Sequence, residues 1–177
     1  MKILFTIIWL FPILFMIHDF EEIIMIKAWE QKNKSYIQAI NNKHIPFNFE
    51  ASTASFSIAV AEEFLIISTI TILSYWFDSY IIWYGFFIAF TIHLFFHIVQ
   101  WMIFKKYVPS LITSIFLIPI CCLAIYKINI MLNYDIIALL FSILISILIM
   151  VGNIYILHIA MKKFDSWLRK YSINSIW

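Results

Sequence analysis

Five long apolar runs, separated by short polar stretches, constrain this chain more than any other feature. They cover about residues 2–25, 51–77, 80–104, 111–126 and 136–161. A helix crosses a bilayer core of about 30 Å with about 20 apolar residues. The composition agrees, because 64% of the chain is hydrophobic and only 12% is charged, whereas an ordinary soluble domain is about 25% charged. We therefore expect an all-α polytopic membrane protein, with one transmembrane domain of five helices over residues 1–177.

The Lys and Arg residues are distributed unevenly between the two sides of such a bundle. The one sizeable connection, residues 27–50, has apolar residues at helical spacing among Lys, Asn and Gln, which is typical of an interfacial segment. With five spans, this interfacial loop, the turn at 105–110 and the C-terminal tail share one side and carry ten of the twelve Lys and Arg residues. The positive-inside rule then predicts that the N-terminus lies outside and the C-terminus lies in the cytoplasm.

The apolar runs also contain nine ionisable side chains, each of which costs roughly 2.5–3.5 kcal/mol to insert on translocon scales. They are His18, Asp19, Glu21, Glu22, Glu62, Glu63, His93, His97 and His158. Away from the ends of the spans no Lys or Arg is present to neutralise the carboxylates. At ~1.5 Å per residue, the groups from four different spans reach the middle-to-cytoplasmic half of the membrane. This common depth predicts one shared polar site, neutralised by a metal ion, by imidazolium or by protonation.

Imidazole and carboxylate together are ligands that zinc and non-haem iron prefer. Four residues apart on a helix, His18 and Glu22 share one face, and so do His93 and His97. Facing helices of a bundle build metal sites in this way. We predict a divalent metal, with zinc favoured over iron, held by His18, Glu22, His93, His97 and His158. The candidate catalytic carboxylates are Glu62 and Glu63, either of which could act as general base, and Glu21.

The stretch His18-Asp19-Phe20-Glu21-Glu22, at the end of the first span, resembles the defining motif of the HXXEE family of small bacterial integral membrane proteins. The Glu62-Glu63 pair and the later histidines are similar to that family's further polar positions. The resemblance implies that His18, Glu21 and Glu22 act as a unit in a bacterial inner or plasma membrane, and it implies no substrate. A weaker similarity links the chain to intramembrane CAAX-type proteases, but Ile67 stands where that family has an arginine.

Three functions fit these residues. The first is metal-dependent hydrolysis or acyl transfer on a membrane lipid or lipidated substrate, whose polar headgroup the hydroxyl-rich stretch 52–57 would admit. The second is a di-iron oxygenase or desaturase acting on acyl or isoprenoid chains, although the Glu-x-x-His pairs of soluble di-iron bundles are absent. The third is a carrier that handles protons or metal ions. Nucleic acid is not an expected partner, because the chain has no basic cluster of groove size.

Overall fold

The structure is a computed structural model that describes residues 2–41 and 52–174. In these residues it contains no strand and five helices: α1 (Lys2–Asn41), α2 (Thr53–Trp76), α3 (Ile81–Phe104), α4 (Leu111–Leu132) and α5 (Ile136–Asn174). Each helix contains a stretch that is long and apolar enough to cross a membrane. The all-α class and the five helices of spanning length are therefore confirmed, and they indicate a multi-pass membrane protein.

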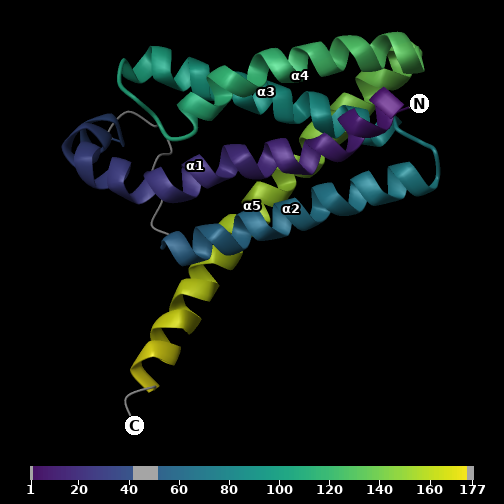
Figure 1. Ribbon diagram of the computed structural model, residues 1–177. Helices are drawn as coiled ribbons and strands as arrows, with labels where there is room; N and C mark the ends of the chain where they lie inside the picture. The colour runs from purple at the N-terminus through teal and green to yellow at the C-terminus, as the bar shows by residue number, and fades with distance from the viewer. Residues whose placement is uncertain (1, 42–51, 175–177) are drawn as a thin grey trace.

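The helices form a bundle of four with a fifth helix laid across it. Successive helices from α1 to α4 run side by side in alternating directions, and α5 crosses them obliquely (Figure 1). α1 packs against α2 and α4, whereas α3 packs against α2, α4 and α5. The C-terminal part of α5 extends beyond the other helices, at the opposite end of the bundle from the N-terminus (Figure 1).

Large aromatic side chains fill the space between α1 and α3. The fully buried ring of Phe11 lies 5.7 Å from the ring of Trp83, 5.2 Å from Phe87 and 5.6 Å from Phe90, measured between centroids. Aromatic pairs in offset or edge-to-face geometry stabilise a core by about 0.5–1.5 kcal/mol each beyond their buried area. This layer lies two helical turns before His18 on α1, so it sets how the faces of α1 and α3 meet at the polar residues.

Small residues allow α3 and α5 to approach closely. A Cβ atom on Gly85 of α3 would lie 2.6 Å from Oγ of Ser146 on α5, closer than real side chains tolerate. Ser142 of α5 donates its hydroxyl to the Ile81 carbonyl at 2.6 Å. Membrane helices commonly pack through such small and hydroxyl-bearing residues, because lipid provides no hydrophobic force between helices.

The first helix extends beyond its predicted span. α1 keeps helical dihedrals through Pro12 and departs from them at Asn33 (φ −110°, ψ 16°). Trp29 is buried and donates its indole N–H to a backbone carbonyl of the α3–α4 turn. The described part of the predicted interfacial loop is thus a helix that packs on this turn, and residues 42–50 of that loop lie outside the described residues.

The start of α2 is bound to α5 by a buried carboxylate. Asp165 of α5 accepts a hydrogen bond from the Ser52 backbone N–H at 3.0 Å and also from the Ser52 and Ser55 hydroxyls. These two hydroxyls, which we expected to face a lipid headgroup, therefore join two helices. α5 itself remains helical through Gly152 and into the basic tail, well past the predicted end at residue 161.

Candidate metal centre

The ionisable residues of the His18–Glu22 motif have three different neighbours. His18 and Glu22 face α3, Glu21 reaches the first turn of α4, and Asp19 lines a cavity between α1, α2 and α5. Successive residues on a helix diverge by about 100°, so adjacent carboxylates cannot share one environment. The motif therefore separates Glu21, which reaches α4, from Asp19 and Glu22, which both line the cavity.

Three imidazoles and one carboxylate meet between α1 and α3. The ring centroid of His18 lies 5.3 Å from that of His93 and 4.9 Å from that of His97, and the latter two are 4.7 Å apart. Each of the three histidines and Glu22 offers a ligand atom, and these atoms all lie within 4.8 Å of one another. Within the described chain, these four residues are the one His, Cys, Asp or Glu group spaced to hold a metal ion.

The ring nitrogens of this His3Glu group point at a common space. Nε2 of His97 lies 3.1 Å from Nε2 of His93, whereas two nitrogens on a tetrahedral zinc ion, each about 2.0–2.1 Å from it, lie roughly 3.3 Å apart. Nε2 of His18 is buried and has no hydrogen-bond partner among the described residues. A buried polar atom without a partner is rare in proteins, and here it faces the other ligands.

Thr113 of α4 orients the His18 ring. Its Oγ1 lies 3.3 Å from Nδ1 of His18 and donates to Oε2 of Glu21 at 2.7 Å. Because that hydroxyl proton goes to the carboxylate, the threonine oxygen accepts from Nδ1–H of His18. This tautomer leaves Nε2 of His18 unprotonated and free to bind a cation. Metal-bound histidines commonly donate their other ring N–H to such an acceptor, which fixes the tautomer.

Glu21 caps α4. Its Oε2 accepts from the Thr113 backbone N–H at 2.7 Å, and its Oε1 accepts from the Ile112 N–H at 3.3 Å and from the Tyr107 hydroxyl at 2.7 Å. The first N–H groups of a helix have no partner within the helix, and a carboxylate there also interacts favourably with the helix dipole. Burial, together with this carboxylate, raises the pKa of Tyr107 in the α3–α4 turn, so the phenol remains a donor.

A cavity of about 160 Å³ opens beside the His3Glu group. Apolar side chains of α2 and α5 form most of its wall, and its polar lining comprises Asp19, Glu22, Glu63, His93, Asn153 and His158. A smaller hollow, lined by Glu22, His97 and Gln100, lies toward the α3–α4 turn. The ligand group thus forms the polar end of a largely apolar space.

The two glutamates of α2 differ in position. Glu63 lines the cavity, whereas Glu62 is not among its lining residues. Oε2 of Glu62 instead accepts a hydrogen bond from the Asn153 amide of α5 at 2.9 Å. Of the two residues predicted as possible general bases, only Glu63 is placed to meet a molecule in the cavity.

His158 does not join the other predicted ligands. It is exposed on α5, lines the cavity at a distance from the His3Glu group, and its Nδ1 lies 2.8 Å from the Ile154 carbonyl oxygen. α5 thus contributes this histidine to the cavity wall but not to the ligand group.

Sequence reasoning did not single out Thr113 or Tyr107, the partners of Glu21 and His18. Threonine and tyrosine are common in apolar helices and turns, and their partners lie more than 80 residues earlier in the chain. The position of Thr113 in the first turn after Pro109-Ser110 was the one available signal, since hydroxyl and acidic groups are favoured where helices begin.

The fold and the site together define a multi-pass helical membrane protein with a buried cluster of three histidines and a glutamate. The chain belongs to the HXXEE family, described as "Protein of unknown function with HXXEE motif", whose family model matches residues 9–124. That segment contains the whole His3Glu group, together with Glu21, Glu63 and Thr113, but not α5. No curated protein and no solved structure matches the chain.

Proposed function

We propose that this protein is a metal-dependent membrane enzyme that hydrolyses, or transfers the acyl group of, a lipid or lipidated substrate. The observation that carries the proposal is the His3Glu group at the polar end of an apolar cavity. Three or four of these side chains would hold a divalent cation, with zinc favoured; with three protein ligands, the fourth position of a tetrahedral zinc ion stays open for water. The Nε2 atoms of His93 and His97 already lie 3.1 Å apart, whereas the whole ligand set lies within 4.8 Å, so binding would draw the more distant ligand atoms inward.

The surrounding residues have separable roles in this proposal. A bound zinc ion would polarise the substrate carbonyl and lower the pKa of a bound water toward neutrality. Glu63 would take the proton of the attacking water and return it to the leaving oxygen, so that an ester and water give an acid and an alcohol. Thr113 would hold the His18 ring in its ligand tautomer, and the walls of α2 and α5 would receive an acyl or isoprenoid chain.

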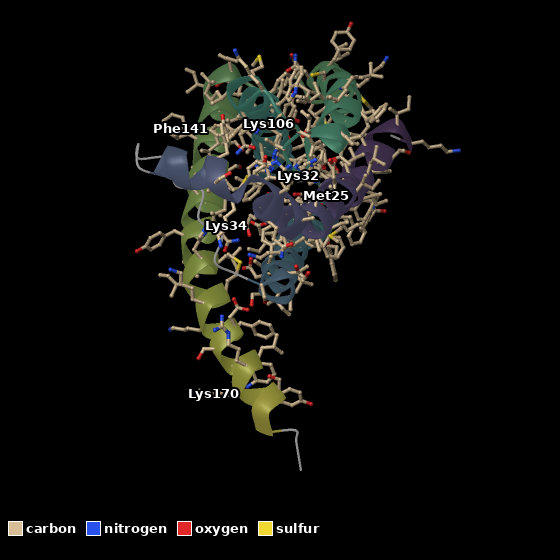
Figure 2. All side chains as sticks on the ribbon, turned by 90° about the vertical axis from the view of Figure 1, so that its left-hand side faces the viewer. Met25, Lys32, Lys34, Lys106, Phe141 and Lys170 are labelled. Atoms are coloured by element: carbon tan, nitrogen blue, oxygen red, sulfur yellow. The ribbon has the colours of Figure 1, made fainter. Side chains whose placement is uncertain are left out.

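The proposal places the N-terminus outside and the C-terminus in the cytoplasm of a cell membrane. Lys32, Lys34 and Lys106 lie at one end of the bundle, and Lys170 lies on the part of α5 that extends below the other helices (Figure 2). This asymmetry supports the orientation because cytoplasmic loops are enriched in Lys and Arg. Reporter fusions at each terminus test it: a C-terminal fusion active only in the periplasm would contradict it.

Metal analysis of detergent-purified protein tests the metal site. We expect about one zinc ion per chain in the wild type and none in His97→Ala. His158→Ala is the matched control, because this histidine lies outside the ligand group; it should retain the metal. Equal metal content in the wild type and His97→Ala would contradict the site.

A turnover assay tests the reaction. Purified protein in lipid vesicles should release a fatty acid or a transferred acyl product, and His97→Ala and Glu63→Gln should abolish that release. Near-stoichiometric iron with oxygen-dependent absorbance changes would instead favour an oxygenase or desaturase. Metal-ion or proton flux across the vesicles, with no lipid product, would favour a carrier.

A further inference from the structure

The cavity contains carboxylates that the His3Glu group does not use. Asp19 and Glu63 line it together with Glu22, yet neither belongs to the metal-ligand group. Asp19 is only 5% exposed, and within the described chain its buried Oδ2 has no hydrogen-bond partner. A buried charge or polar atom without a partner is costly, so this oxygen requires a donor from outside the chain.

The side chains that line the cavity indicate the charge of the ligand that carries this donor. The carboxyls of Asp19, Glu22 and Glu63 line the same cavity, where ionised carboxylates repel one another. No Lys or Arg is among the residues that line the cavity. A phosphate or carboxylate headgroup placed here would meet three carboxyls and no Lys or Arg, whereas a cation would relieve their repulsion.

The other lining residues favour an organic ammonium group over a second metal ion as this cation. A second metal ion needs several ligands at ion distance, and the described residues supply one such group only. The remaining wall is formed by residues such as Phe56, Val60 and Leu157, which offer apolar surface. An ammonium group has three N–H donors and accepts wider oxygen spacing, and an attached hydrocarbon chain would cover the apolar wall.

We propose that the cavity binds an amphiphile with a protonated amine: the ammonium lies between Asp19 and Glu63, and the hydrocarbon chain lies along α2 and α5. Such a headgroup occurs in lipids built on amino alcohols. In these lipids a free amine lies close to the oxygen that carries the acyl group. The inference rests on the proposed function only in taking this cavity as the substrate site. It assigns Asp19 to substrate recognition, a role separate from the adjacent ligand His18.

Binding of three twelve-carbon amphiphiles tests the charge preference. Radiolabelled dodecylamine, dodecanol and dodecanoate are titrated into metal-free protein in phosphatidylcholine nanodiscs, with empty nanodiscs as the blank. We expect saturable dodecylamine binding at least about tenfold tighter than dodecanol, since a hydrogen bond to a charged group adds more than a tenfold factor. Dodecanoate should not bind saturably. Equal affinity for dodecylamine and dodecanol would overturn the proposal.

Two variants locate the ammonium, and a third is the control. Glu63→Gln and Asp19→Asn should each weaken dodecylamine binding about tenfold or more and leave dodecanol binding unchanged. Glu62→Gln is the matched control, because it makes the same change at the adjacent residue outside the cavity; its dodecylamine affinity should equal that of the wild type. If Asp19→Asn does not fold, Glu63→Gln against Glu62→Gln decides the matter, and equal loss in both would overturn the proposal.

The experiment separates this inference from the proposed enzyme. One outcome is amine binding to the metal-free protein, with no metal in the purified protein and no turnover. It would support the cation-binding cavity and contradict the proposed enzyme. One metal ion per chain with turnover, but without amine preference, would do the reverse. Two metal ions per chain, the second lost in Glu63→Gln, would overturn the ammonium assignment.

Discussion

Two nearby carboxylates on opposite sides of α1 differ in how fully they are hydrogen-bonded. On the α4 side, Glu21 accepts hydrogen bonds from two backbone N–H groups and two hydroxyls. On the α2 side, Asp19 is more deeply buried than Glu21 and has an oxygen without any partner in the described chain. Only Phe20 separates these two residues, and both lie in the same five-residue motif.

The contrast separates structural from functional charge. A carboxylate whose oxygens are all paired joins helices together and has no capacity left for a ligand. A carboxylate or imidazole with an unpaired atom in a cavity weakens the fold unless something binds it. The motif therefore combines one residue that stabilises the bundle, Glu21, with two whose buried atoms have no hydrogen-bond partner in the described chain, His18 and Asp19.

The largest effect is expected for Glu22→Ala. Four ligands share a zinc-binding free energy of about 10–16 kcal/mol, so the loss of one should weaken metal binding by roughly 100- to 1,000-fold. Competition with a chelator of known affinity measures this change. The metal-free variant should lose less stability than Glu21→Ala does, because among the described residues the Ser110 side chain is the one hydrogen-bond partner of Glu22 at the start of α4. A metal-free loss as large as that of Glu21→Ala would break the comparison.

The opposite pattern is expected for Glu21→Ala. Four donors at the start of α4 and in the α3–α4 turn would lose their acceptor, which should reduce the free energy of unfolding by about 2–3 kcal/mol. Unfolding in mixed micelles with increasing dodecyl sulfate measures this loss. The loss should be present without bound metal, and Glu21→Gln, which keeps one acceptor oxygen, should be milder.

Thr113→Val should affect both sides, because its hydroxyl joins Glu21 to His18. The loss of a side chain that accepts the ring N–H of a metal-binding histidine typically weakens metal binding by ~10–100-fold. The variant keeps the shape of the side chain and the backbone bond to Glu21, so α4 should remain capped. Chelator competition and unfolding in the same micelles test both points; unchanged metal affinity would show that His18 is oriented by other contacts.

The smallest effect concerns pH and Tyr107. Its pKa lies above the ordinary value of about 10, first because of burial and then because of Glu21. The bond to Glu21 therefore contributes its full stability below pH ~10, and this contribution is lost as pH rises further, since only the unfolded state then releases the proton. Tyr107→Phe should be about 1.5 kcal/mol less stable at pH 8, and this gap should narrow above pH ~10. A gap independent of pH would contradict the bond.

Much of the fold follows from hydropathy and spacing alone. Each apolar run is long enough to form a helix whose backbone needs no outside partner, which explains why the order of the five helices was predictable. The spacing of four residues put His18 with Glu22 and His93 with His97 on common faces, and the structure brings these two faces together.

The rotations of α2 and α5 were not predictable in the same way. Both helices are apolar on nearly all sides, so no polar face shows whether Glu62 or Glu63 points inward. The oblique course of α5 depends on the small residues Gly85, Ser142 and Ser146, whose effect appears only when two helices are in contact. His158 was therefore predicted as a metal ligand, whereas it lines the cavity outside the ligand group.

The adjacency of Glu21 and Glu22 has a consequence for variants of changed length. Inserting one residue between Glu21 and Glu22 would rotate the part of α1 after the insertion by about 100° relative to the part before it. Glu21 would then turn from α4, or Glu22 from the histidines, and no shift of the helix along its axis could restore both. The motif should thus tolerate many replacements at Phe20, which faces outward, and no change in its number of residues.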